Sequence, residues 1–184
     1  MCDKMDWKKS NEKEGNVIFF TGLSCSGKTT IADELAKRLE NEGIMVERLD
    51  GDVVRDNIND DLGFTKQDRD ENLDRVTFIT KLLYRNGVTV ICSFISPFKD
   101  KRQEIKDMFG NNFDLVYTKC RIDECASRDD SGLYEKAMNG EIDNFTGVNH
   151  PYQIPRGDDV ITVDTEKLSV EECVDNIICE LELE

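Results

Sequence analysis

The stretch "NVIFFTGLSCSGKTTIADEL" (residues 16–35) decides the fold of this chain. Its short apolar run, residues 16–21, is typical of a buried strand, and the residues after the loop have the apolar spacing of a helix. Between them, residues 22–29 match the pattern G-x-x-x-x-G-K-[ST]. Glycines at those places let backbone N–H groups approach phosphate oxygens closely. The sequence therefore predicts a strand, a phosphate-binding loop and a helix, in that order.

Each polar residue of this loop has an expected task. Lys28 should reach the β- and γ-phosphates of a nucleotide as a catalytic group, and the Thr29 hydroxyl should hold Mg²⁺. The N-terminus of the following helix adds its dipole. The expected ATP-binding residues are Gly22, Leu23, Ser24, Cys25, Ser26, Gly27, Lys28, Thr29 and Thr30. The alternative is a glycine-rich turn with an exposed lysine, which the strand before and the helix after disfavour.

Further apolar runs alternate with helical patterns along the rest of the chain. Strands are expected at residues 45–50, 88–94, 113–118 and 160–163. This alternation is typical of an α/β fold, with a parallel sheet between helices. We expect one domain over residues 16–184, preceded by a flexible leader over residues 1–15.

The composition limits the class of partner. The formal net charge is −15, with 39 acidic and 24 basic residues, and such a surface repels nucleic acid and anionic membranes. No apolar run is long enough to span a membrane, and the N-terminus lacks the apolar core of a signal peptide. The seven cysteines are odd in number and lack a C-x-x-C pair, as is typical of reduced thiols. We expect a cytoplasmic protein.

The ends of the other strands suggest where a phosphate acceptor binds. In an open parallel sheet, ligands sit at the carboxyl ends of the strands. One such end carries Asp50-Gly51-Asp52, and another carries "SFISP" (residues 93–97). Asp52 is thus placed to orient or deprotonate an acceptor hydroxyl, and Arg55 to bind an anionic one. The alternative is that residues 50–52 form an ordinary turn.

The longest predicted helix, residues 67–87, gives a second clue. Its apolar stripe, extended backward by helical steps, reaches Asn72 and Arg69, which should therefore face the cleft. The alternative is a solvated first turn in which Glu71 and Arg75 form an i,i+4 ion pair. The sequence leaves both open.

Taken together, these motifs resemble the adenylylsulfate kinase (APS kinase) family. The resemblance runs from Asn16 to Pro155 and rests on "GLSCSGKTTIA", "LDGDVVR", "DLGF", "DRDEN", "SFISP", "GLYEKAMNGEI" and "FTGVNHPY". It implies a P-loop kinase domain with a mobile lid, from Gly132 to about Tyr152. It also implies transfer of the γ-phosphate of MgATP to the 3′-hydroxyl of adenosine 5′-phosphosulfate, giving 3′-phosphoadenosine 5′-phosphosulfate for sulfate activation. A homodimer is implied as well.

The resemblance assigns roles to residues of this chain. Asp52 would hold or deprotonate the 3′-hydroxyl, and Arg128 would lie against the adenine of ATP. Phe64 and Phe145 would stack on the adenine of the acceptor, although core filling is their alternative. The implied acceptor-binding residues are Asp50, Asp52, Arg55, Phe64, Arg69, Asn72, Ile95, Ser96 and Phe145.

The chain departs from the family pattern at three places. Val53 replaces a usual asparagine, Asp56-Asn57 replaces a usual His-Gly, and Ser131 replaces a usual lysine before "GLY". These departures leave a rival: a kinase of the same build acting on another small hydroxyl acceptor, such as a nucleoside 5′-phosphoramidate or a sugar acid. A second rival is a nucleotide-binding module without catalysis, against which the second pocket argues.

Overall fold

The structure, a computed structural model, describes residues 14–181 of the chain. Residues 1–13, most of the predicted leader, and residues 182–184 lie outside the described part. The two described residues of the predicted leader adjoin the end of a helix, where Tyr84 donates a hydrogen bond to Glu14 and Gly15 N–H donates to the Tyr84 carbonyl. Within residues 14–181, no helix has the length and apolar character needed to cross a bilayer.

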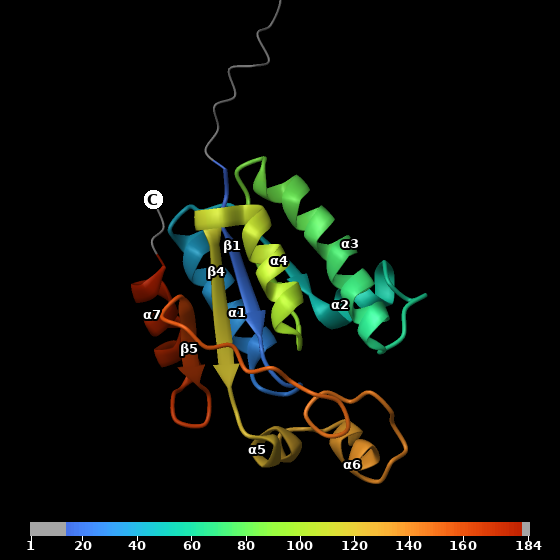
Figure 1. Cartoon of the computed structure of the whole chain (residues 1–184). Helices are drawn as coiled ribbons and strands as arrows, with labels where there is room; N and C mark the ends of the chain where they lie inside the picture. Colours follow the sequence, from blue (N-terminus) through green and yellow to red (C-terminus); the bar gives the residue numbers. More distant parts are fainter. Residues whose placement is uncertain (1–13, 182–184) are drawn as a thin grey trace, which may run out of the picture.

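One parallel sheet forms the centre of the fold (Figure 1). Its order is β2-β3-β1-β4-β5, so the first strand lies between two strands that come later in the chain. The strands are β1 (Val17–Thr21), β2 (Val46–Asp50), β3 (Thr89–Ser93), β4 (Phe113–Lys119) and β5 (Val160–Asp164). A reversal of strand order beside β1 opens a crevice at the carboxyl ends of β1 and its neighbours.

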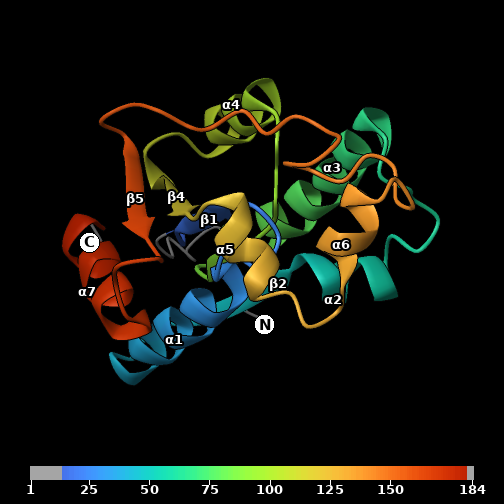
Figure 2. The same cartoon turned by 90° about the horizontal axis from the view of Figure 1, so that it is seen from below.

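Helices cover both faces of the sheet, as Figure 2 shows from below. Helices α1 (Lys28–Asn41) and α7 (Val170–Glu180) lie on one face, and α3 (Lys66–Tyr84) and α4 (Lys99–Phe109) lie on the other. The shorter elements are α2 (Gly51–Asn57), α5 (Ile122–Ser127), α6 (Leu133–Met138) and the 3₁₀ turn η2 (Gly110–Asn112). The predicted α/β architecture with a parallel sheet between helices is confirmed.

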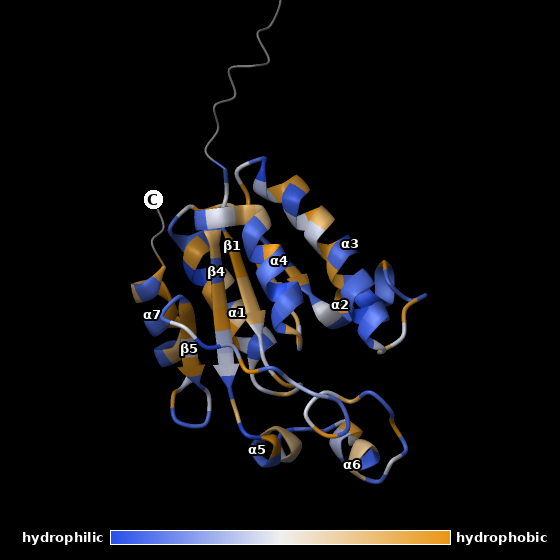
Figure 3. Cartoon of the chain, viewed as in Figure 1, coloured by the Kyte–Doolittle hydropathy of each residue, from blue (hydrophilic) through white to orange (hydrophobic). Residues whose placement is uncertain are grey.

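The core consists of two apolar layers, one on each side of the sheet. Ile18 and Phe20 of β1 point into the layer shared with α1 and α7, whereas Val17 and Phe19 point into the layer under α3 and α4. Successive strand side chains alternate between faces, so a strand buried on both sides reads as a continuous apolar run. Figure 3 shows this as hydrophobic colour along the strands and mixed colour along the helices.

The start of α3 positions part of the site. Thr65 accepts a hydrogen bond from Asp68 N–H, and the Asp68 carboxylate accepts one from Thr65 N–H, so the two residues form a capping box. The helix therefore begins at the crevice and runs back along the sheet to Tyr84. The sequence did not predict α2, because seven residues are too few to show a helical period; instead, the Asp50 side chain caps it.

Candidate active site

A cavity of about 620 Å³ lies at the carboxyl ends of the strands. One part is bounded by the phosphate loop and the starts of α1 and α7; the other is bounded by α2, α3 and the end of β3. Predicted residues lining it are Ser24, Cys25, Gly27, Lys28, Thr29, Thr30, Asp50, Asp52, Arg55, Phe64, Arg69, Asn72, Ile95, Ser96 and Arg128. The structure thus brings together residues from both predicted pockets.

The phosphate loop is built for close approach. Gly27 has φ +93° and caps α1 without a side chain, so the first N–H groups of that helix remain free for a ligand. A Cβ on Gly22 would stand 2.2 Å from Thr118 Oγ1, so this position must be glycine. Ser26 is buried and lies 2.7 Å from the same hydroxyl. The side chains of Leu23 and Ser26 support the loop from beneath and, like Gly22, do not line the cavity.

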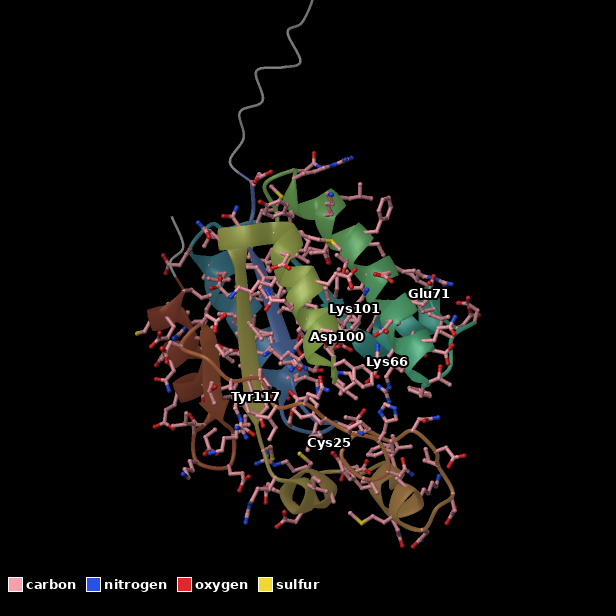
Figure 4. The ribbon with its side chains drawn as sticks, in the orientation of Figure 1. Cys25, Lys66, Glu71, Asp100, Lys101 and Tyr117 are labelled. Carbon is pink, nitrogen blue, oxygen red and sulfur yellow. The ribbon has the colours of Figure 1, made fainter. Side chains whose placement is uncertain are left out.

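Backbone strain gathers around this cavity. The non-glycine residues with positive φ in the described chain are Cys25 (+57°), Ser96 (+40°) and Asn144 (+57°). Cys25 and Ser96 line the cavity, and Asn144 offers its carbonyl to Arg69. Figure 4 shows Cys25 between the strand ends and α5. Each such conformation costs on the order of 1 kcal/mol and persists where the surroundings hold it, commonly at functional sites.

Lys28 is the cation of the nucleotide side. Its Nζ donates to the Leu23 carbonyl at 2.5 Å. Burial lowers the pKa of Lys28 to about 8, against the opposing influence of Cys125, Cys25, Asp50 and Asp52. A phosphate group beside Nζ would favour the protonated form, because opposite charges stabilise one another.

Asp50 links the two parts of the cavity. Its Oδ2 accepts from Thr29 Oγ1 at 2.8 Å, and its Oδ1 accepts from Asp52 N–H at 3.1 Å. Residues 50–52 therefore cap and begin α2 rather than form only a turn, and Asp52 in its first turn lines the cavity. A hydroxyl beside a carboxylate is an arrangement of oxygen donors suited to Mg²⁺.

Two arginines that donate to backbone carbonyls form the acceptor side. Arg55 donates to the carbonyls of Leu62 and Gly63 at 3.2 and 3.1 Å, and Arg69 donates to those of Phe64 and Asn144 at 3.1 and 2.8 Å. Within residues 14–181, neither forms an ion pair with a carboxylate.

The two guanidinium groups lie close together around one aromatic ring. Their carbons are 4.4 Å (Arg55) and 5.4 Å (Arg69) from the centre of the Phe64 ring. Burial, together with the charge of Arg55, lowers the pKa of Arg69 to about 10. Such a pair of partly desolvated cations favours an anionic ligand.

Asn72 and the end of β3 complete that side. Arg69 and Asn72 are 7% and 5% exposed and line the cavity, which confirms that they face inward. Glu71 and Arg75 do pair, at 3.1 Å, but the burial of Arg69 and Asn72 contradicts the alternative of a solvated first turn. The hydroxyls of Ser93 and Ser96 are buried without a hydrogen-bond partner in the described chain.

Ion pairs connect α3 and α4 behind the acceptor side. Lys101 of α4 pairs with Asp74 of α3, and Lys66 of α3 lies 3.6 Å from Asp100 of α4. Figure 4 shows Lys66, Asp100 and Lys101 together between the two helices. These contacts link α3 to α4 behind the acceptor side.

The segment expected to be the lid packs on the phosphate loop. Tyr134 of α6 donates its hydroxyl to the Ser24 carbonyl at 3.0 Å, and Tyr152 lies 3.0 Å from Thr21 Oγ1. Phe145 does not line the cavity. Its ring meets that of Tyr134 edge-on, with centres 4.8 Å apart. Phe145 is thus half-buried beside the small core of the lid, and its role in stacking on the acceptor stays a prediction.

The far end of the nucleotide side is lined by Arg128 and by residues that the sequence did not predict. Arg128 donates to the Thr165 carbonyl at 2.9 Å and to Glu124 at 2.9 Å. The unpredicted lining residues after β5 are Thr165, Leu168, Ser169, Val170 and Cys173. These residues could have been predicted from the rule that ligands bind at the carboxyl ends of parallel strands, since β5 is parallel to β4.

Comparison with known proteins agrees with this geometry. A family model described as adenylylsulphate kinase matches residues 14–163. An adenylyl-sulfate kinase of Halothermothrix orenii is 46% identical over 170 residues, which are 92% of this chain and 91% of the relative. One of Clostridium kluyveri is 47% identical over 178 residues, covering 97% and 89% of the two chains.

Solved structures give the same result. The Mycobacterium tuberculosis APS kinase CysC, in complex with AMPPNP and APS, has a TM-score of 0.86 at 37% identity and covers 93% of this chain and 99% of its own. A gluconokinase from Sinorhizobium meliloti, at 17% identity and a TM-score of 0.62, shares the fold alone. Given the family match and the near full-length relatives, this chain belongs to the adenylylsulphate kinase family.

Proposed function

We propose that this chain transfers the γ-phosphate of MgATP to the 3′-hydroxyl of adenosine 5′-phosphosulfate. The observation that carries the proposal is one cavity that joins a complete phosphate loop to two arginines that form no ion pair in the described chain. The relative from Mycobacterium tuberculosis, in complex with AMPPNP and APS, supports the same pair of ligands.

On the nucleotide side, the free N–H groups before and at the start of α1 would bind the phosphates. Lys28 would exchange its bond to the Leu23 carbonyl for the β- and γ-phosphates. Arg128 would lie against the adenine. Because phosphoryl transfer needs little covalent help, positioning and charge neutralisation supply most of the catalysis.

The Thr29 hydroxyl, with Asp50 beside it, fits a role in holding Mg²⁺. In the described chain, no cluster of three or more His, Cys, Asp or Glu side chains could hold a metal, so the ion would arrive with the nucleotide. When bound, Mg²⁺ would offset the negative charge of the phosphates.

On the acceptor side, Asp52 would orient or deprotonate the 3′-hydroxyl. Arg55, Arg69 and Asn72 would bind the phosphosulfate and sugar, and Phe64, which is 52% exposed, would stack on the adenine. The backbone at Ile95 and the unpartnered hydroxyl of Ser96 would line the same pocket. Closure of the segment from Gly132 to Tyr152 would exclude water that otherwise hydrolyses ATP.

The start of the domain, the oligomeric state and the location of the enzyme are proposed on the resemblance alone. We expect the kinase domain to begin at Asn16, two copies to form a homodimer, and the enzyme to work in the cytoplasm. These features set where the activity occurs and leave the chemistry of the cavity unchanged.

Two of the departures from the family pattern, Val53 and Ser131, do not favour another acceptor. Val53 is 61% exposed, and neither it nor Ser131 lines the cavity. Ser131 instead donates to the Asp129 carboxylate at the turn before α6. The acceptor pocket therefore keeps the charge pattern that an anionic nucleotide needs.

Turnover of MgATP with and without adenosine 5′-phosphosulfate tests the proposal, with the product identified by mass. We expect a product heavier by one phosphate and little ATP hydrolysis without the acceptor. A nucleoside 5′-phosphoramidate and gluconate serve as rival acceptors in parallel. Phosphorylation of either rival in preference to adenosine 5′-phosphosulfate would overturn the proposed acceptor, and no transfer to any of them would favour the non-catalytic module.

A further inference from the structure

A buried asparagine lies behind the acceptor side and outside the cavity. Asn59, in the connection between α2 and α3, is 0% exposed and is not one of the residues lining the cavity. Both ends of its amide are used: Nδ2 donates to Asn72 Oδ1 at 2.8 Å, and Oδ1 accepts from Arg75 at 3.3 Å. Burying an amide is costly unless its bonds are made, so this one has a defined arrangement.

Arg75 determines which way the Asn59 amide points. A guanidinium group only donates hydrogen bonds, so the atom of Asn59 that faces it must be the oxygen. Arg75 is itself fixed by a two-pronged pair with Asp61, at 2.7 and 2.8 Å, and by Glu71 at 3.1 Å. Figure 4 shows Glu71 at the outer edge of α3. A surface ion-pair network therefore sets the direction of a buried amide.

Asn59 in turn determines which way Asn72 points. Because Nδ2 of Asn59 is a donor, the atom of Asn72 that faces it must be the oxygen. The Nδ2 group of Asn72 is then left over. It has no hydrogen-bond partner in residues 14–181, and Asn72 lines the cavity. We call this chain of hydrogen bonds, from Arg75 through Asn59 to Asn72, the relay. It leaves a hydrogen-bond donor, rather than an oxygen, facing the part of the cavity expected to bind the phosphate acceptor.

We propose that Asn59 is a positioning residue, which orients the Asn72 amide so that its N–H₂ group binds an oxygen of the anionic acceptor. This inference rests on the proposed function, which gives Asn72 its ligand. An Asn72 amide turned the other way would present an oxygen to a phosphosulfate or a sugar oxygen. Two acceptors facing each other repel, so the direction of this amide selects for an oxygen-rich substrate.

The change Asn59→Asp tests the direction of the relay with almost no change of shape. An ionised carboxylate only accepts hydrogen bonds, and Arg75 stabilises it in place. It would bind Nδ2 of Asn72 and turn the oxygen toward the acceptor. We expect the KM for adenosine 5′-phosphosulfate to rise about tenfold, the loss of one hydrogen bond to a charged group. The KM for MgATP should stay within about twofold, because the phosphate loop is untouched.

Two further variants separate direction from charge and from folding. Asn57→Asp adds the same charge at the exposed end of α2, where Asn57 Nδ2 donates only to the Val53 carbonyl, and should leave both KM values unchanged. Asn59→Ala removes the relay without reversing it, so its KM for the acceptor should rise less than that of Asn59→Asp. If Asn59→Asp fails to fold, an equal acceptor KM in Asn59→Ala and the wild type contradicts the inference.

A double-mutant cycle shows whether Asn59 acts through Asn72. In an Asn72→Ala background, Asn59→Asp should raise the acceptor KM no further. If the effects of Asn59→Asp and Asn72→Ala on the acceptor KM add in the double variant, the inference is wrong. It is also wrong if Asn72→Ala raises the acceptor KM and Asn59→Asp does not. If Asn72→Ala leaves the KM for the acceptor unchanged, the role proposed for Asn72 is wrong. If the wild type is inactive on adenosine 5′-phosphosulfate, the proposed function itself is wrong. Either result also removes the inference.

Discussion

The nucleotide side and the acceptor side of the cavity hold their polar groups in different ways. On the nucleotide side, the two central polar side chains already have partners within the site: Lys28 donates to a loop carbonyl and Thr29 to Asp50. On the acceptor side, Arg55 and Arg69 donate only to backbone carbonyls and form no ion pair in the described chain.

This difference indicates two modes of binding. A nucleotide must displace the internal bonds of Lys28 and Thr29, so contacts with its phosphates change kcat, whereas contacts with its adenine, as proposed for Arg128, change the KM for MgATP. The acceptor meets partly desolvated cations and the unpartnered hydroxyls of Ser93 and Ser96, so its contacts add binding and change KM. The predictions below test this division.

The largest effect is expected on the nucleotide side, from Lys28→Ala. Loss of a main electrostatic contact with the transferring phosphate should lower kcat by about 10³-fold. The fold should persist, since Lys28 supports the core with a single bond to the Leu23 carbonyl. Steady-state kinetics with a circular-dichroism check measure this, and near-normal turnover in the folded variant would remove this loop from catalysis.

The next effect is expected from Asp52→Asn, at the boundary of the two sides. The change keeps the size of the side chain and removes its charge and basicity. If Asp52 orients or deprotonates the acceptor hydroxyl, kcat should fall about 10²-fold while nucleotide binding survives. Single-turnover rates and nucleotide titration together measure this, and an unchanged rate would leave Asp52 only its place in the first turn of α2.

A smaller effect follows from the pKa of Lys28, about 8 in the free protein because of burial. Bound phosphate raises this pKa, so nucleotide binding takes up a proton and weakens as pH rises through 8. The affinity for a non-hydrolysable ATP analogue should fall about tenfold between pH 7 and 9. Calorimetric titration in two buffers of different ionisation enthalpy measures the proton uptake.

Lys28→Arg is the matched control for that titration. A guanidinium group stays protonated throughout this pH range, so the proton uptake should vanish. Proton uptake of equal size in the variant and the wild type would assign the titration to another group.

The sequence predicted what depends on local pattern. The phosphate loop is contiguous, and the spacing that defines it also requires a strand before it and a helix after it. Arg69 and Asn72 could be placed in the cleft because a helix continues its inward face over several turns. The same periodicity gave the order of strands and helices along the chain.

What the sequence did not predict depends on contacts between distant residues. The contact of Phe145 with Tyr134 joins two parts of the lid and has no signal in the local sequence. Asn59 showed no signal because its role comes from Arg75 and Asn72, which reach it only in the folded chain. The lining residues that follow β5, from Thr165 to Cys173, lie at the cavity because β5 lies beside β4 in the sheet.

The central claim, that the two sides of the cavity bind their ligands independently, is tested most directly by a crossed pair of variants. Arg69→Ala should raise the KM for adenosine 5′-phosphosulfate about tenfold and leave the KM for MgATP within about twofold. Arg128→Ala, at the opposite end of the cavity, should raise only the KM for MgATP. Steady-state kinetics on both variants measure all four values, and equal changes in both KM values within each variant would contradict the division.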